Sequence, residues 1–473
     1  MSVHENEAHG MPYRLLSCCM DQFVYRDSVL FGEGVNLATV ADAVGTPCYV
    51  YSRATLEDHA DKLAGAFGGL NPLICFAVKC CPNVHVLRAL VGRGLGMDVV
   101  SGGELYRARL AGAPGDRIVF AGVGKSDQEL REALGAWTPT AEQIAQARAM
   151  GVGPEALVEP IGCFNIESEQ EYEVLAGVAR AAGKTCRAAI RVNPKVKAGG
   201  HAHITTATEE SKFGVMPEQA LAMFKRFGGE STVRLTGLHM HIGSSILDPG
   251  PYVEAVKRLL ELADAAMAAG ARLSTLDIGG GFGADYSTGD AAPAAEFASA
   301  LTPLLEPYVK RGIRVVLEPG RTIAANAGVL LTRVLYTKVN GRKKFVVVDA
   351  GMNTLIRPSL YEAFHFAWPV SVAPQHEPVR RTASPELPGL EVCDLVGPVC
   401  ESGDFLARDR MLPPLVRGDL VAVYAAGAYG MAMASRYNSR NLPAEVMVSG
   451  DTFEVIRRGE RDEDQLAHEV ASR

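Results

Sequence analysis

The sequence predicts an α/β fold in which a (β/α)8 TIM barrel is combined with an antiparallel β-barrel or β-sandwich domain. The chain has 473 residues, which is the length of two domains rather than one. Eight short apolar runs alternate with segments of helical period over roughly residues 70–320. After Arg321 the long helical segments stop, and strand-like runs separated by Gly/Pro turns follow.

The eight apolar runs are expected to form the barrel strands. They are nearly continuous in apolar residues, which is typical of parallel strands buried on both faces. An open doubly wound sheet is the competing architecture, but eight successive strand–helix units favour closure. Two capping boxes, S-D-Q-E at 126–129 and S-E-Q-E at 168–171, predict helix starts. The expected strands are residues 73–78, 96–100, 117–121, 162–166, 187–192, 235–241, 275–278 and 315–318.

The remainder of the chain is expected to form the β domain. Runs such as K-F-V-V-V-D and D-L-V-A-V-Y follow one another without long helices, which indicates an antiparallel arrangement. Short strand-like runs before residue 46 are expected to join it, and the Pro-rich stretch 373–388 is expected to be a surface loop. The predicted division is residues 1–46 for the N-terminal strands, 47–322 for the barrel and 323–473 for the C-terminal β domain.

Composition excludes several classes of function. The formal net charge is −7 and no basic block stands out, so no nucleic-acid partner is expected. No run of eighteen apolar residues occurs, and we expect no membrane-spanning helix. The ten cysteines are scattered without a C-x-x-C pair or a paired Cys/His spacing, so no metal site is expected. Free thiols and a polar, acidic start indicate a reducing cytoplasm.

The carboxyl ends of the strands are where barrels of this kind place their reactive side chains. In this sequence those ends hold the residue types that a pyridoxal phosphate site needs. Lys79 ends the apolar run F-A-V-K. Desolvation is expected to lower its pKa, and the neutral amine is the form that reacts with an aldehyde. For any single strand-end lysine, a side chain that only reaches solvent is the alternative. The strand-end set is Lys79, Asp98, His241, Gly279, Gly280, Gly281 and Glu318.

The other strand-end residues have matching roles. Glu318 would face the pyridine nitrogen and keep it protonated, although an ion pair with Arg321 is an alternative. The triple glycine would let backbone N–H groups approach a phosphate, and Gly320 with Arg321 would complete that cradle. A plain tight turn is the alternative for such a glycine run.

The run H-M-H-I-G-S supplies two further candidates. His241 is expected to lie flat on the pyridine face, and Ser244 is expected to reach the phosphate. His239 lies on the same side of the strand, two residues earlier. We take His241 as the rim residue because it is nearer the carboxyl end. A structural histidine is the alternative for either of them.

A series of motifs in fixed order carries a resemblance to a known family. The segments F-A-V-K, G-M-D-V-V-S-G-G-E-L, F-N-I-E-S, R-V-N-P, S-K-F-G-V, H-M-H-I-G-S, D-I-G-G-G-F and E-P-G-R resemble the fold-type III pyridoxal-phosphate-dependent decarboxylases, whose fold is alanine racemase-like. In the C-terminal half, R-P-S-L-Y, C-E-S-G-D, D-L-V-A-V-Y-A-A-G-A-Y-G and Y-N-S-R resemble the diaminopimelate decarboxylases within that group. The resemblance covers about residues 20–450.

The resemblance implies roles for residues beyond the strand ends. Cys400 corresponds to the family's proton donor, and Glu401 beside it would pair with a substrate ammonium. Arg321 and Arg357 would hold a carboxylate, since the guanidinium fork matches its geometry. Tyr361 would add a hydroxyl to the substrate site, and Tyr429 would touch both coenzyme and substrate. The E-P-G-R motif also brings Pro319 and Gly320 to the coenzyme.

These residues discriminate among substrates. Ornithine and lysine end in an ammonium alone, whereas diaminopimelate ends in a second amino-acid head that needs both a cation and an acid. Arg357 and Glu401 supply that pair. The resemblance therefore implies decarboxylation of meso-2,6-diaminopimelate to L-lysine with pyridoxal phosphate as cofactor. It also implies a homodimer with shared active sites, because in the family Cys400 and Glu401 reach the coenzyme of the partner subunit.

One segment and one pair of residues depart from the family pattern. Residues 135–160 are extra, and they contain the helical stretch T-A-E-Q-I-A-Q-A-R-A-M. We expect this segment at the amino-terminal rim of the barrel, away from the chemistry. Cys80 and Cys81 are expected to be small apolar fillers, with a regulatory thiol as the alternative.

Three rival functions are considered. An amino-acid racemase on this fold would need a second acid or base opposite Lys79. A non-catalytic binding protein derived from a decarboxylase would be expected to lose Lys79 or Cys400, and both are present. A decarboxylase of a related substrate, such as a carboxylated polyamine precursor or a siderophore intermediate, is the closer competitor.

Overall fold

The barrel forms as predicted. A computed structural model describes residues 21–196, 211–288 and 291–469. Eight parallel strands close in the order β10-β11-β12-β5-β6-β7-β8-β9, so the eight predicted strands are confirmed, with ends displaced by at most two residues. Every residue of the first three strands is buried. The strands are β5 Leu73–Ala77, β6 Gly96–Val99, β7 Ile118–Phe120, β8 Cys163–Ile166, β9 Cys186–Arg191, β10 Val233–His239, β11 Thr275–Asp277 and β12 Arg314–Leu317.

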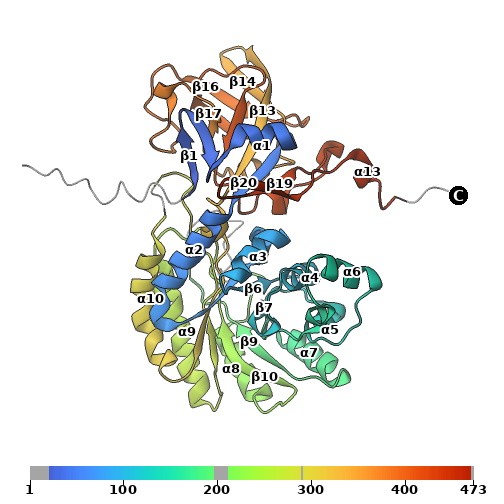
Figure 1. Cartoon of the computed structure of the whole chain (residues 1–473). Helices are drawn as coiled ribbons and strands as arrows, with labels where there is room; N and C mark the ends of the chain where they lie inside the picture. The colour runs from blue at the N-terminus through green and yellow to red at the C-terminus, as the bar shows by residue number, and fades with distance from the viewer. Residues whose placement is uncertain (1–20, 197–210, 289–290, 470–473) are drawn as a thin grey trace, which may run out of the picture.

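Helices cover the outside of the barrel, as Figure 1 shows for α7, α8, α9 and α10. Each buries an apolar stripe against the strands; in α9 the stripe includes Tyr252, Val256, Leu259 and Ala263. Among the described helices, none is long and apolar enough to cross a bilayer. The bounds are α2 Arg53–Ala66, α3 Val84–Gly92, α4 Gly102–Leu110, α5 Asp127–Ala133, α6 Ala141–Ala149, α7 Glu169–Ala181, α8 Pro217–Phe227, α9 Gly250–Ala268, α10 Ala294–Val309 and α11 Arg321–Ala324.

The two predicted helix starts are found, but only one is a complete capping box. Ser126 and Glu129 close the box at the start of α5. At α7, Ser168 accepts the N–H of Glu171, but the Glu171 carboxylate accepts the N–H of Glu167 instead. The same carboxylate pairs with the fully buried Lys125. The predicted second half of that box is therefore wrong, because a buried lysine reorients the carboxylate.

The second domain is a nine-stranded mixed sheet above the barrel in Figure 1, with β17-β16-β14-β13-β4-β19-β20 in order and β18 and β15 attached to β13. Most pairs are antiparallel as predicted, but β14–β16 and β4–β19 are parallel. Residues 48–52 were expected in the barrel part, whereas their pairing places them in this sheet. The strands are β4 Cys48–Ser52, β13 Gly328–Asn340, β14 Lys343–Val348, β15 Ala367–Pro369, β16 Glu391–Val396, β17 Phe405–Leu412, β18 Leu420–Val423, β19 Ala444–Ser449 and β20 Thr452–Arg457.

Shorter elements complete the fold. β1 (Phe23–Arg26), β2 (Val29–Gly32) and β3 (Val35–Asn36) form a separate three-stranded sheet. It is attached to the β domain through the N–H of Leu30, which donates to the carbonyl of Val370 at 2.7 Å. The remaining helices are α1 Leu37–Val44, α12 Arg357–Tyr361 and α13 Asp462–Gln465. Residues 1–20 of the expected N-terminal segment lie outside the described residues.

The extra segment 135–160 contains the predicted helix, α6, which Thr140 and Gln143 start with a capping box. The segment connects α5 to β8. Ala147 and Leu157 form a small apolar cluster with Leu110 of α4. Segment 135–160 thus packs against α4 on the outside of the barrel, away from the carboxyl ends of the strands.

Candidate active site

Lys79 lies in the 3-10 turn η3 (Val78–Cys80), directly after β5. Its Nζ is 2.8 Å from Oδ2 of Asp98 on β6. Asp98 is fully buried, whereas 33% of the Lys79 side chain is exposed. Burial lowers the pKa of Lys79, but Asp98 outweighs that effect and the net pKa is raised. The expectation that desolvation lowers this pKa is therefore wrong, because it left out the partner carboxylate.

A layer of buried polar side chains lies inside the barrel. Oε2 of Glu318, directly after β12, is 3.2 Å from Nε2 of His239. Nδ2 of Asn165 donates to Oε1 of Glu318 at 3.2 Å and to Oδ2 of Asp277 at 3.3 Å. Burial raises the pKa of Glu318, but His239 and Lys79 bring it below its usual range. Burial and Glu318 raise the pKa of Asp277 well above its usual range. Glu318 is therefore the ionised acid of this pair.

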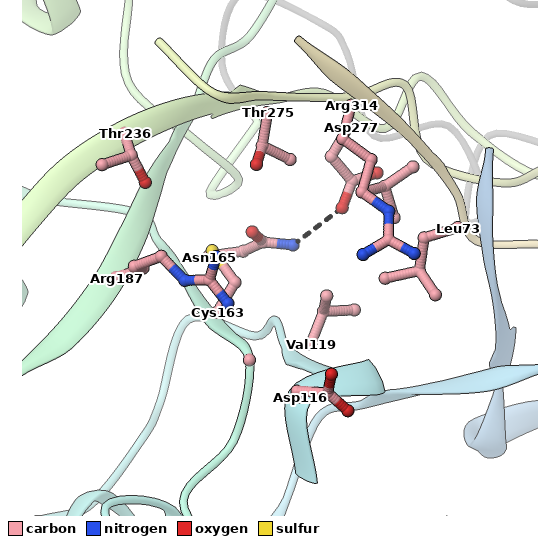
Figure 2. A pocket seen from close by; sticks show the side chains of 12 residues that line it. Leu73, Asp116, Val119, Cys163, Asn165, Arg187, Thr236, Thr275, Asp277 and Arg314 are labelled. Atoms are coloured by element: carbon pink, nitrogen blue, oxygen red, sulfur yellow. Dashed lines mark hydrogen bonds between the residues drawn. The ribbon is translucent and has the colours of Figure 1, made fainter. Parts of the chain in front are cut away.

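A small cavity of about 40 Å³ reaches the same layer. Asn165 and Asp277 line it, and Figure 2 shows them joined by a hydrogen bond, with Arg187 and Arg314 on flanking segments. Among the described residues, Oδ1 of Asn165 has no hydrogen-bond partner. The cavity is polar and large enough for a water molecule that would satisfy this oxygen.

His241 follows β10 and accepts the N–H of Gly280 on Nδ1 at 3.2 Å. Burial lowers the pKa of His241 well below its usual range, and the positive charges of Lys79 and Arg191 add to that effect. The ring is therefore neutral, and because Nδ1 is an acceptor, the proton is assigned to Nε2. Both histidines of H-M-H-I-G-S thus belong to the site, since His239 holds Glu318.

The glycine turn after β11 is required by the packing of neighbouring loops. A Cβ on Gly280 would lie 1.7 Å from the carbonyl oxygen of Glu318, and one on Gly281 would lie 2.1 Å from that of Gly243. The φ angle of Gly281 is +104°, which also favours glycine. The backbone of Gly280 and Gly281 therefore packs directly between the loops that follow β10 and β12, with no side chain in between.

Two guanidinium groups meet at one phenol beside this turn. Nη1 of Arg321 and Nη1 of Arg357 both donate to Oη of Tyr286, each at 2.5 Å. Arg321 also donates through Nε and Nη2 to Oγ of Ser244, at 3.1 and 3.0 Å. Tyr286 was not predicted from the sequence, because a tyrosine in the irregular loop G-A-D-Y-S carries no motif of its own.

Tyr429 comes to the site from the β domain. Its N–H donates to the carbonyl of Cys80 at 2.7 Å, with φ at +57°. The Arg321 guanidinium lies 4.8 Å from the centroid of its ring. Cys80 and Cys81 are 1% and 2% exposed, as expected for small fillers. Tyr361 is the last residue of α12, on which Arg357 is the first.

Cys400 and Glu401 form a second, exposed group. The backbone N–H and Sγ of Cys400 both contact Oδ1 of Asn438 at 3.2 Å, and the Tyr437 hydroxyl donates to Glu401. Within the described part of the chain, no hydrogen bond or ion pair joins Cys400 or Glu401 to Lys79. One chain therefore presents the barrel group and the Cys400 group as two separate sets.

The comparisons with known proteins agree with this geometry. Residues 53–325 match the family model of the pyridoxal-dependent decarboxylase, pyridoxal binding domain. The chain is 43% identical to diaminopimelate decarboxylase of Aquifex aeolicus, over 92% of this chain and 94% of that protein. It is 41% identical to the Pseudomonas aeruginosa enzyme, over 95% and 99%. This chain belongs to the diaminopimelate decarboxylase family.

A solved structure supports the same membership. Diaminopimelate decarboxylase from Helicobacter pylori in complex with L-lysine is 35% identical, with a TM-score of 0.79 over 91% of this chain and 98% of that chain. The resemblance found in the sequence motifs is thus confirmed, together with the fold and with pyridoxal phosphate as the cofactor of the family.

Proposed function

We propose that this chain decarboxylates meso-2,6-diaminopimelate to L-lysine and carbon dioxide. The observation that carries the proposal is the pair of buried guanidinium groups, Arg321 and Arg357, which converge on one phenol oxygen. Such a pair matches a carboxylate. The two arginines would therefore bind the carboxylate of the second amino-acid group of diaminopimelate. Ornithine and lysine have no such group and would not need this site.

The described residues fit pyridoxal phosphate. Lys79 offers an amine for its aldehyde, and the ionised, buried Glu318 suits a protonated pyridine nitrogen. The neutral ring of His241 suits the coenzyme face. The bare glycine backbone and Ser244 would hold the phosphate. Once bound, the coenzyme supplies the electron sink that makes loss of carbon dioxide possible.

The protein's own residues have separate tasks in the proposed reaction. Asp98 pairs with the amine of Lys79 and stabilises its protonated form. His239 and Asn165 keep Glu318 oriented and ionised. Arg357 and Arg321 fix the far end of the substrate, and Cys400 would deliver the proton that replaces the lost carboxylate.

We also propose a homodimer with shared active sites. Cys400 and Glu401 are exposed, and their described contacts lead to Asn438 and Tyr437 rather than to Lys79. A second copy related by a twofold axis would bring the Cys400 group to the barrel group of the first. A cytoplasmic location is part of the same proposal, and the free thiols of all eight described cysteines support it.

Carbon dioxide release tests the substrate. The purified protein with pyridoxal phosphate is given meso-diaminopimelate, ornithine or lysine in separate reactions. We expect release from meso-diaminopimelate alone, with L-lysine as the other product. Faster release from ornithine or lysine would overturn the substrate assignment, and release from none of them would overturn decarboxylation of this class.

Mixing two inactive variants tests the shared site. Lys79→Ala removes the barrel amine and Cys400→Ala removes the exposed thiol. If each site uses both chains, random mixing forms mixed dimers with one intact site, and about a quarter of the normal activity returns. If both residues act within one chain, the mixture stays inactive, which would contradict the shared site.

A further inference from the structure

Tyr286 has an oxygen whose acceptor capacity is already used. It accepts Nη1–H of Arg321 and Nη1–H of Arg357, both at 2.5 Å. A phenol oxygen that accepts twice still carries its own O–H. Among the described residues, no acceptor for that O–H is found. This donor is therefore available to a partner outside the described residues.

The surroundings call for an anion as that partner. Arg321 and Arg357 are each 6% exposed, and their guanidinium carbons lie 5.7 and 4.7 Å from the Tyr286 ring centroid. Nε of Arg357 is also buried without a hydrogen-bond partner in the described chain. Two buried like charges and an unused donor thus converge at one point.

Tyr286 is placed where a ligand can reach it. It is half-buried, so part of its side chain is accessible to a ligand. Its ring is fixed on one side by an edge contact with His365, at 5.2 Å between centroids. The phenol is therefore held in orientation by its ring and its oxygen while part of it stays accessible.

We propose that Tyr286 is a substrate-binding residue whose O–H donates to the distal carboxylate of the amino acid while its oxygen holds Arg321 and Arg357 in place. This inference rests on the proposed function and adds a specificity residue to it. Three donors, rather than two, then recognise the carboxylate that distinguishes diaminopimelate from ornithine and lysine as a substrate.

The charges around the phenol strengthen it as a donor. Burial raises the pKa of Tyr286, but Arg321 and Arg357 outweigh that effect and the net pKa is lowered. The other titratable groups facing it are His365, which burial keeps neutral with a pKa lowered to about 3, and Tyr429. Binding needs the protonated phenol, so a carboxylate at this point raises the pKa of Tyr286.

Two competitive inhibitors distinguish recognition of the carboxylate from a general effect of Tyr286 on ligand binding. L-lysine and 1,5-diaminopentane differ only by the carboxylate. In Tyr286→Phe we expect the inhibition constant of L-lysine to rise about 10- to 100-fold, with that of 1,5-diaminopentane unchanged. Tyr308→Phe on α10 is the matched control, since its hydroxyl bonds Asp264 away from the site, and it should change neither constant. An equal loss for both inhibitors, or no loss, would overturn the proposal.

A second measurement uses the unaltered chain and does not depend on the variant folding. Ultraviolet titration follows phenolate formation with and without each inhibitor. L-lysine should move one tyrosine titration to higher pH, and 1,5-diaminopentane should not. An unchanged titration with bound L-lysine would refute the O–H contact. Failure of the proposed function is distinguishable, because it shows as absent carbon dioxide release from meso-diaminopimelate.

Discussion

Replacing Asp98 by asparagine is expected to shift the pH at which Lys79 accepts the coenzyme. Asparagine keeps the shape of the side chain and removes its charge. Asp98 is the main group that raises the pKa of Lys79 against the effect of burial, and Tyr429 and Glu318 contribute less. In Asp98→Asn the pKa of Lys79 should therefore fall, and the neutral amine should be present at lower pH.

The size of the shift follows from the geometry. Nζ and Oδ2 are 2.8 Å apart, which places the two charge centres about 4 Å from each other, and at an effective dielectric constant of about 20 this is about 4 kcal/mol. One third of the Lys79 side chain is exposed, so solvent screening reduces the figure to about 2 kcal/mol. That energy lowers the pKa of Lys79 by about 1.5.

The assay measures the rate of coenzyme attachment against pH. Coenzyme-free protein is mixed with pyridoxal phosphate, reduced with borohydride after short times, and the modified protein is quantified by mass spectrometry. The midpoint should lie about 1.5 pH units lower in Asp98→Asn than in the unaltered chain. Asp58→Asn, which removes only an exposed pair with Lys62, is the control. Equal midpoints for all three proteins would refute the argument.

Three further substitutions test other parts of the account. Gly280→Ala should lower the free energy of unfolding by more than about 4 kcal/mol or prevent folding, because of its 1.7 Å contact, whereas Gly92→Ala meets nothing within 4 Å; equal denaturant midpoints would contradict this. Arg357→Lys should raise KM for meso-diaminopimelate about 10- to 100-fold, because a lysine ammonium cannot make the bidentate contact with the substrate carboxylate that a guanidinium can make. An unchanged KM in steady-state kinetics would contradict this. Thr140→Ala should cost about 1 kcal/mol in denaturant unfolding through its lost cap on α6 with kcat unchanged, and a loss of turnover in the folded protein would show that segment 135–160 is not peripheral.

Local pattern was sufficient to predict the barrel. Most residues of its strands are buried, so the sequence shows a nearly continuous apolar run at each one. The strand β4 was assigned to the wrong part of the chain, because C-Y-V-Y-S has the same apolar character as a barrel strand. Its partners, β13 and β19, are far away in sequence. The local sequence therefore does not distinguish a barrel strand from a buried strand of the second domain.

The site was predictable where a residue ends a strand and unpredictable where it depends on a long-range partner. Lys79, Asp98 and Glu318 stand at strand ends, and the architecture alone brings them together. The raised pKa of Lys79 follows from a neighbour on another strand. Tyr286 depends on two arginines that are 35 and 71 residues away. Such contacts leave no periodic or local signal.

The lysine that binds the coenzyme can be identified on the chain itself. The holoenzyme is reduced with borohydride and digested, and the peptide that carries the pyridoxyl group is identified by mass spectrometry. We expect a single modified residue, Lys79, and no modification of a Lys79→Ala variant. A pyridoxyl group on another lysine, or an equally labelled Lys79→Ala variant, would contradict it.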